Sequence, residues 1–411
     1  MEFLTDPIKV IYEWLMLTFT GWGWAGWVSS LVINLLAIVV FIMAIMVLDI
    51  LLVWVERKVV ARFQDRLGPN RVGPFGIFQP FPDIIKLILK EDITPEGADR
   101  VPFNLAPILS LASVLFLWAV VPLASRIYGV DLNVALLYLV AAGSIGTLSI
   151  IMAGWASNNK YALLGAYRMV ANMISYEIPM VVALLIPTVL AGSMSLKVIT
   201  EAQSTNGGVW FVLISPLGAL IFLIAAIAEL GRSPFDLNEG ESEIVSGYHI
   251  EYSGMKFGLF YAGELLHAFT FGGFVAALFF GGWHGPWAEQ YPLLGAFYFV
   301  AKAMFGYWVI MWVKYTVPRI RIDHMLAFNW KFLTPLAFVL LMVTAVMHRI
   351  LTDVRGLLDA STGADGLGLL AYVAGMFLSN VILVWITVEV LRAQARRERE
   401  AKVSARLAAA D

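Results

Sequence analysis

The sequence contains no cysteine among its 411 residues. It therefore cannot bind an iron–sulfur cluster through thiolates, form a disulfide or use a thiol nucleophile. It also lacks the pattern GxxxxGK[ST], so a P-loop for nucleotide phosphates has no support. We expect this chain to bind no NAD, no FMN, no iron–sulfur cluster and no metal, so that any redox centre lies in a partner.

Charged residues are scarce. They make up 14% of the chain, against 60% hydrophobic residues, and the formal net charge is -2. A soluble domain has about 25% charged residues. The mean hydropathy of +0.79 indicates a polytopic membrane protein, for which we expect membrane lipids as partners and no nucleic acid.

Long apolar runs dominate the rest of the chain. A helix needs about 20 apolar residues to cross the hydrocarbon core, and no period-2 pattern suggests a barrel. The first run has no basic leader or small-residue cleavage site and predicts an anchor rather than a removable signal. We predict an all-α bundle as one transmembrane domain, 1–391, followed by a basic tail, 392–411. Its nine expected spans are 29–55, 103–124, 133–156, 172–192, 210–230, 257–282, 295–317, 332–349 and 368–391.

Basic residues favour one orientation of these spans. With the N-terminus outside, the inside segments carry 21 Lys and Arg and the outside segments carry 5. The positive-inside rule then predicts an outside N-terminus and a cytoplasmic C-terminus. A soluble partner could dock on the inside face, where the charged loops lie.

The first inside loop contains a short amphipathic segment. Its "GPNRVGP" is turn chemistry, and the residues after it alternate with helical period between an apolar and a charged face. The segment is too short to cross a membrane and is expected to lie along its surface. It is either a structural interfacial helix or the doorway for a lipid-soluble substrate. The apolar residues are Phe81, Ile84, Ile85 and Ile88, and the charged ones are Asp83, Lys86 and Lys90.

Two acids fall inside predicted spans, Glu177 and Glu264. An ionised side chain there costs about 2.5 kcal/mol or more, so each needs a cavity, a partner or a proton. His267 follows Glu264 by three residues and could be its partner, although a single histidine in a span is more often a packing residue. Glu56 and Arg57, by contrast, stand at the inside end of the first span, where charges normally mark the interface.

An acidic loop, "FDLNEGESEIVSGYHIEYSG", lies between two apolar segments. Solvation is the ordinary explanation for acids in a loop, but the loop also holds Phe235, Leu237 and Ile244, so we expect it to fold back onto the protein. Carboxylates packed near one another titrate together, and some of their pKa values rise. We predict a proton relay from this loop to the acids within the spans. The loop acids are Asp236, Glu239, Glu241, Glu243 and Glu251.

The last inside loop, "VPRIRIDHMLAFNWK", supplies Arg319 and Arg321. It is either an ordinary positive-inside loop or a source of charge balance and of donors to a quinone carbonyl.

Three motifs together resemble a known family. They are "ERKVVARFQDRLGPNRVGPFGIFQPFPDIIKLILKED", "AELGRSPFDLNEGESEIVSGYHIEYSGMKFGLFYAGE" and "RIRIDHMLAFNWK". In this order they resemble the H subunit (subunit 1 in mitochondria) of respiratory complex I, the NADH:quinone oxidoreductase, over roughly residues 30–350. The resemblance implies a quinone chamber shared with the hydrophilic-arm subunit that carries the terminal iron–sulfur cluster, other membrane subunits as neighbours, and a bacterial plasma membrane location.

The resemblance also implies roles for individual residues. Quinone is the expected substrate, and the acids are expected to begin the path that links its reduction to proton translocation. The positions matching the quinone chamber are Glu56, Arg57, Asp83, Tyr261, Arg319 and Arg321. Those matching the acidic pathway are Glu177, Asp236, Glu239, Glu241, Glu243, Glu251 and Glu264.

Two other functions stay open on the sequence. A homologous subunit of a membrane-bound hydrogenase or related dehydrogenase would keep the membrane architecture without needing quinone. An autonomous proton-coupled transporter would also carry acids within its spans, but the missing internal repeat counts against it.

Overall fold

The computed structural model describes residues 6–205, 208–236, 245–362 and 365–408. The regular secondary structure of these residues is helical, without a strand, which confirms the predicted all-α class. The α-helices are α2 (Pro7–Gly21), α3 (Gly26–Phe63), α4 (Pro80–Leu89), α5 (Arg100–Leu117), α6 (Ala135–Ala156), α7 (Lys160–Ala191), α8 (Leu196–Thr205), α9 (Phe211–Ile214), α10 (Pro216–Glu229), α12 (Gly254–Phe279), α13 (Pro292–Thr316), α14 (Ile322–Phe328), α15 (Thr334–Thr362) and α16 (Asp365–Ala408). Short turns of other helix types are η1 (Pro74–Gly76), η2 (Gly247–His249) and η3 (Asn329–Leu333).

Eight helices in the described residues are long and apolar enough to cross a membrane, and they correspond to eight of the nine predicted spans. The predicted fifth span, 210–230, is instead broken into α9 and α10 at Ser215. Pro216 has no N–H to continue the helix. Much of α10 is buried in the core, where an irregular backbone at membrane depth is tolerated because protein surrounds it.

Several helices extend beyond the predicted spans. Residues 157–171, expected as an inside loop, are helical from Lys160, because the side chain of Asn159 caps α7 by accepting the N–H of Tyr161 at 2.9 Å. The eighth span is longer than expected, because the apolar helical stretch runs over Ile322–Gly356. Helices α2 and α8 were not predicted.

The stretch "GWGWAG" at 21–26 has the spacing GxGxxG, which sequence reasoning overlooked. A dinucleotide fingerprint follows a strand and opens a helix, whereas this stretch joins α2 to α3. It therefore gives no support for NAD binding.

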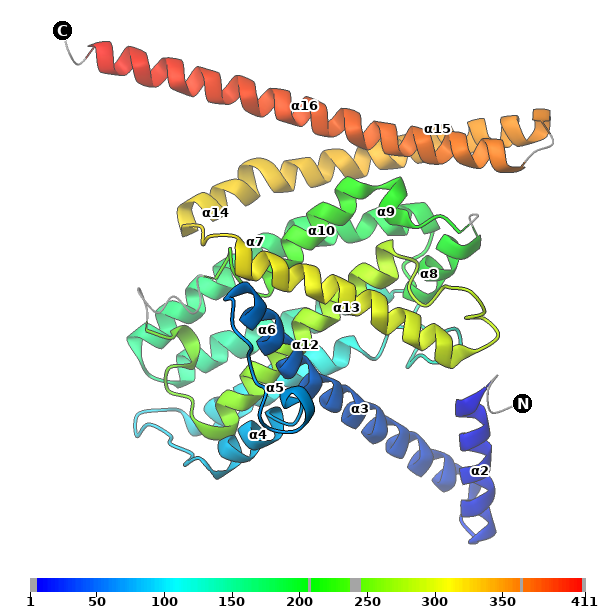
Figure 1. Cartoon of the computed structure of the whole chain (residues 1–411), viewed down its shortest axis with the longest axis vertical. Helices are drawn as coiled ribbons and strands as arrows, with labels where there is room; N and C mark the ends of the chain where they lie inside the picture. Colours follow the sequence, from blue (N-terminus) through cyan, green and yellow to red (C-terminus); the bar gives the residue numbers. More distant parts are fainter. Residues whose placement is uncertain (1–5, 206–207, 237–244, 363–364, 409–411) are drawn as a thin grey trace.

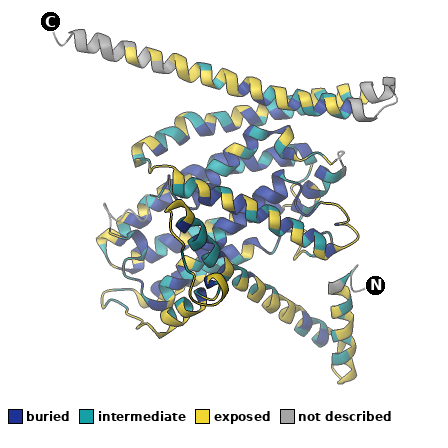
Figure 2. Cartoon of the chain, in the orientation of Figure 1, coloured by how far each residue is buried: buried dark blue, intermediate teal, exposed yellow. Residues whose placement is uncertain are grey.

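Helix α12 lies at the centre of the bundle, packed against α5 and α13 (Figure 1). In its most apolar window 83% of the residues are buried, against 11% for α3. Helix α2 and the first half of α3 extend away from the bundle, and α15 and α16 pair along its side (Figure 1). These helices carry many exposed residues (Figure 2), and many of those residues are apolar. Exposed apolar helices of this kind are what lipid or neighbouring membrane subunits cover.

The connections between helices gather at two ends of the bundle. At one end, Asn159 contacts Glu251, Lys256 contacts Asp92, and the N–H of Ile320 bonds the carbonyl of Pro234. These contacts join four of the loops predicted to lie inside, and we call this the charged end. The predicted outside loops meet at the other end, for example where Ser195 donates to Asp131 at 2.7 Å.

Candidate functional site

An ion pair ties the amphipathic helix α4 to the end of α3 at the charged end. The guanidinium of Arg57 contacts the carboxylate of Asp83, and Lys86 lies 3.8 Å from the same side chain. The apolar face of α4 is exposed, with Ile85 at 56% and Ile88 at 61%. The structure therefore holds α4 by its charged side and leaves its apolar side uncovered, which suits contact with lipid or with a lipid-soluble molecule.

Glu56 lies at the centre of a buried ion-pair network beside this helix. Its Oε1 accepts hydrogen bonds from Lys314 Nζ at 2.9 Å and from the Tyr315 hydroxyl at 2.6 Å, and Arg232 Nη1 is 3.5 Å away. The side chains of Glu56 and Arg232 are only 7% and 2% exposed. Charge-assisted bonds of this kind are about twice as strong as neutral ones, and they require the ends of α3 and α13 to stay together.

Arg232 joins this network to a second acid. Its Nε donates to Glu264 Oε1 at 3.1 Å, so one guanidinium bridges α3 and α12. Gly231, with φ of +60°, supplies the turn after α10 that precedes it. Burial alone would lower the pKa of Arg232, but the carboxylates of Glu56 and Glu264 raise it above its ordinary value. We call Glu56, Arg232, Glu264, Lys314 and Tyr315 the Arg232 cluster.

Two small cavities continue from this cluster into the bundle. The first, about 40 Å³, is lined by Glu264, Glu229, His267 and Tyr248 among others. The second, about 30 Å³, is lined by Glu229, His267 and Glu177. Because a water needs about 10–15 Å³ of such space, each cavity has room for water. Glu229 and His267 line both of them, so three acids lie along two adjoining cavities whose other walls are largely apolar: Glu264, Glu229 and Glu177.

Glu177, on the second cavity, has its own hydrogen-bond donor. The hydroxyl of Ser144 on α6 donates to Glu177 Oε1 at 3.2 Å. Glu229 is 5% exposed, and its Oε2 has no hydrogen-bond partner among the described residues. A buried polar atom without a partner requires an explanation such as water or a functional role, and its position on both cavities supplies one.

His267 packs against a neighbouring ring, the more common role for a single histidine in a span, and does not take up the alternative role of partner to Glu264. Glu264 bonds Arg232, while the ring of His267 stacks on Phe271 with centroids 4.8 Å apart. The two side chains line the same cavity without a recorded bond between them.

Other predicted site residues are not members of the Arg232 cluster, although Tyr261 interacts electrostatically with it. Arg319 and Arg321 are exposed, and Arg321 pairs with Asp323 at 3.4 Å. Glu251 accepts a bond from Asn159 at 2.7 Å, which fastens the end of the acidic loop to the start of α7. Tyr261 is 38% exposed and stands three residues before Glu264 on α12. Asp236 is half-buried, and Glu239, Glu241 and Glu243 lie outside the described residues.

Sequence reasoning missed four charged residues that the structure places here, Arg232, Glu229, Lys314 and Asp49. Glu229 and Arg232 sit near a predicted span boundary, where charges look ordinary. Lys314 stood out only as a lysine left within a span. Asp49 stands seven residues before Glu56 and so on the same face of α3, which is the signal that could have found it.

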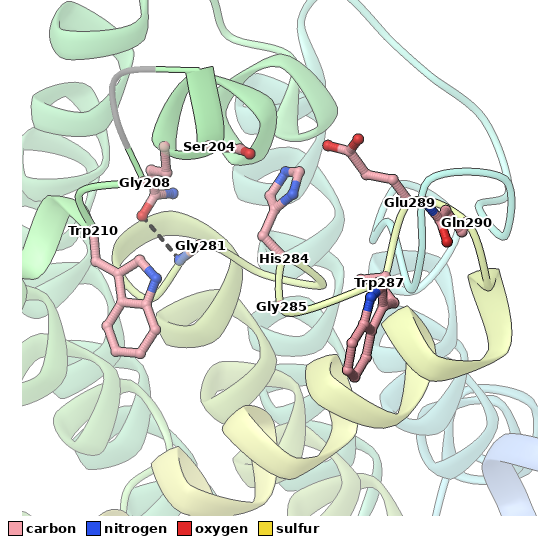
Figure 3. A pocket seen from close by; sticks show the side chains of 11 residues that line it. Ser204, Gly208, Trp210, Gly281, His284, Gly285, Trp287, Glu289 and Gln290 are labelled. Atoms are coloured by element: carbon pink, nitrogen blue, oxygen red, sulfur yellow. Dashed lines mark hydrogen bonds between the residues drawn. The ribbon is translucent and has the colours of Figure 1, made fainter.

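A larger cavity than these two lies at the opposite end of the bundle (Figure 3). It measures about 460 Å³, is lined by Trp210, His284 and Glu289 among others, and contains none of the predicted site residues. Gln203 supports its wall by accepting the N–H of Gly281 at 2.9 Å, the bond drawn in the figure. Its size alone does not make it the functional site, because the buried charges are concentrated at the charged end.

Comparisons with known proteins agree with this architecture. The family model NADH dehydrogenase matches residues 35–345. The chain is 45% identical over 328 residues to the H subunit of NADH-quinone oxidoreductase from Dehalococcoides mccartyi (strain CBDB1), covering 80% of this chain and 90% of the relative. It is 43% identical to the corresponding H subunits of Geobacter metallireducens (77% and 96% covered) and of Brevibacillus brevis (80% and 95% covered). The chain therefore belongs to the NADH dehydrogenase family and is a membrane subunit of an NADH-quinone oxidoreductase.

Proposed function

We propose that this subunit forms the chamber through which quinone enters from the bilayer, and that its acids begin the pathway coupling quinone reduction to proton translocation. The observation that carries the proposal is the bridge of Arg232 between Glu56 and Glu264. It joins the region of Arg57, Asp83 and α4, where quinone is expected, to the acids that line the internal cavities.

Entry from the membrane is supported by α4. Quinone is lipid-soluble but has a polar headgroup. Its entrance should therefore be apolar where it faces the lipid and polar where the headgroup enters the protein. The exposed Phe81, Ile85 and Ile88 supply the apolar side, and the Arg57–Asp83 ion pair stands where a polar headgroup would arrive. Tyr261, which is partly exposed near the Arg232 cluster, is a candidate hydroxyl donor to a quinone oxygen.

Proton movement is supported by the order of the acids. A change of charge near Arg232 acts directly on Glu264, because Arg232 donates a hydrogen bond to Glu264. From Glu264, water entering the two cavities would connect Glu229 with Glu177, which line them. Carboxylates and water in such a row exchange protons over hydrogen-bond distances.

The charged end is also where we place the soluble partners. The hydrophilic-arm subunit with the terminal iron–sulfur cluster would dock there, against the exposed Arg319 and Arg321. The exposed apolar helices would face lipid and the other membrane subunits. By the distribution of basic residues, the charged end faces the cytoplasm of a bacterium, with the N-terminus outside.

A photoreactive quinone analogue tests the chamber. Irradiated with the intact complex in its membrane, it should label peptides of this subunit that contain Asp83 or Tyr261, and excess quinone should compete. Label confined to other subunits, or to the cavity of Trp210 and Trp287 at the opposite end, would contradict the assignment.

Variants test the acidic loop, which remains a prediction from the sequence. Glu241→Gln should leave assembly intact while lowering quinone reduction and proton pumping together, because the amide cannot carry a proton. Full activity of both kinds in well-assembled variants at Glu239, Glu241 and Glu243 would remove these residues from the pathway.

A further inference from the structure

Asp49 is a buried acid within the membrane-spanning part of α3 that the proposed function does not use. It is 4% exposed, and its Oδ1 has no hydrogen-bond partner among the described residues. A carboxylate at such a depth is costly when ionised and uncompensated. Its neighbours therefore decide its chemical state.

The helix geometry places Asp49 one layer deeper than Glu56. Seven residues correspond to two turns, about 10 Å along the helix axis on one face. Tyr307 stands seven residues before Lys314 on α13, which packs against α3. Asp49 and Tyr307 interact electrostatically, so the layer of Glu56 and Lys314 is followed by a layer of Asp49 and Tyr307.

Charge in this region is unbalanced by one acid. Two cations, Arg232 and Lys314, are bonded to two carboxylates, Glu264 and Glu56. Asp49 interacts electrostatically with Glu56 and Arg232, but neither cation bonds it. The layer of Asp49 offers a tyrosine hydroxyl, and the Tyr307 oxygen is itself buried without a partner in the described residues. Tyr261 on α12, which interacts electrostatically with Tyr307, adds no positive charge.

We propose that Asp49 is the proton reserve of the Arg232 cluster, a neutral carboxylic acid in the resting complex beside the ionised Glu56. Protonation removes the one uncompensated charge. A protonated Asp49 can both donate and accept a hydrogen bond, which suits the neighbouring hydroxyl of Tyr307. Only one part rests on the proposed function: when quinone reduction alters the charge of the cluster, Asp49 is the acid that releases or regains the proton.

Infrared spectroscopy of the intact complex tests the resting state. A protonated carboxyl gives a C=O stretching band that shifts in D₂O, and this band should be weaker by one acid in Asp49→Asn. Asp131→Asn is the matched control, because Asp131 accepts a bond from Ser195 at the opposite end, and it should leave the band unchanged. Equal bands in wild type and Asp49→Asn would overturn the proposal.

Thermal stability supplies a second measurement if the spectra are weak. A neutral Asp49 makes the Asn variant isosteric and uncharged like the original, so the midpoint of thermal disassembly should stay the same. An ionised Asp49 that stabilised Arg232 would instead give a marked fall, which would overturn the proposal.

Redox difference spectra test the role in turnover separately. The Asp49 band should change on quinone reduction in wild type and be absent from the difference spectrum of Asp49→Asn. A band that is present at rest but unchanged on reduction would overturn the reserve role. A reserve that responds while quinone labels another subunit would instead overturn the proposed chamber.

Discussion

The ammonium of Lys314 on α13 donates a hydrogen bond to Glu56 on α3 at 2.9 Å, so a lysine within one span neutralises an acid at the end of another. The Glu56 side chain is 7% exposed and that of Lys314 25% exposed. The pair is one of the contacts that hold α3 against the bundle, and among the eight candidate membrane-spanning helices of the described residues α3 has the smallest buried share in its most apolar window.

Removing this cation should destabilise the assembly. Lys314→Met keeps the length of the side chain but leaves Glu56 with Arg232 and Tyr315 alone, and breaking a buried ion pair costs about 3 kcal/mol. The midpoint of thermal disassembly should therefore fall. Lys331→Met, at an exposed position, is the control and should change little. An unchanged midpoint in Lys314→Met would mean that the pair contributes nothing to stability.

A double-mutant cycle should detect the bond between Asn159 and Glu251. Asn159→Ala and Glu251→Ala each remove one side of a charge-assisted hydrogen bond of 2.7 Å. We expect a coupling free energy of about 1.5 kcal/mol in the stability of the purified complex. Additive effects of the two substitutions would show that the end of the acidic loop is fastened by other contacts.

Close packing of α12 on α13 depends on Gly272. A Cβ added there would lie 2.5 Å from the carbonyl oxygen of Ala303 and 2.8 Å from the nitrogen of Tyr307, so the backbones would have to separate. Small residues at such crossings let membrane helices approach closely. Gly272→Ala should cost about 1–3 kcal/mol, measured as a lower midpoint of thermal disassembly.

Gly356→Ala is the matched control for that substitution. It also lies in a helix, α15, but a Cβ there meets no atom within 4 Å. Since alanine favours helix over glycine by about 1 kcal/mol, the control should be neutral or stabilising. Equal losses at both positions would exclude close packing as the cause.

Acid should weaken the fold through His249, which lies in the loop segment η2 outside the spans. Burial lowers the pKa of His249 below its ordinary 6.5, and the charge of Glu264 opposes this only in part. The unfolded chain therefore binds a proton that the folded chain does not, and stability is lost as pH falls below about 6.5.

Replacement of the ring isolates this effect. His249 packs against the rings of Tyr248 and Phe257, so His249→Phe keeps the packing and removes the titration. The loss of thermal stability from about pH 7.5 to about pH 5.5 should be smaller in this variant than in wild type. His324→Phe, at an exposed position, should retain the wild-type slope, and equal slopes in all three proteins would contradict the prediction.

Composition and apolar run length were enough to predict the fold class, because membrane helices must satisfy their backbone within each segment. The broken fifth span was missed because membrane helices tolerate proline, so Pro216 did not stand out, and because a run of apolar residues looks the same whether protein or lipid surrounds it. Likewise, Asn159 starts α7 twelve residues before the predicted span, because a cap and a polar first turn extend a helix beyond the apolar window.

The site could be predicted only in part, because the sequence does not show which residues come into contact in the folded protein. Glu56 and Glu264 could be proposed from their positions in the sequence, but Arg232 between them could not, because the bond joins segments that are far apart in the chain. Glu229 was missed for a related reason: an acid at the end of an apolar run resembles an interfacial charge until a cavity is seen on each side of it.

The most direct test of the acidic pathway is the substitution Glu229→Gln, assayed in the purified complex reconstituted into vesicles. Glutamine keeps the size of the side chain but cannot carry a proton, and positioned proton transfer commonly contributes 10²-fold or more to a rate. We therefore predict that quinone reduction and proton pumping fall together by at least about tenfold, with assembly intact, while Glu289→Gln at the opposite end retains both. Wild-type rates of both processes in an assembled Glu229→Gln complex would contradict the account.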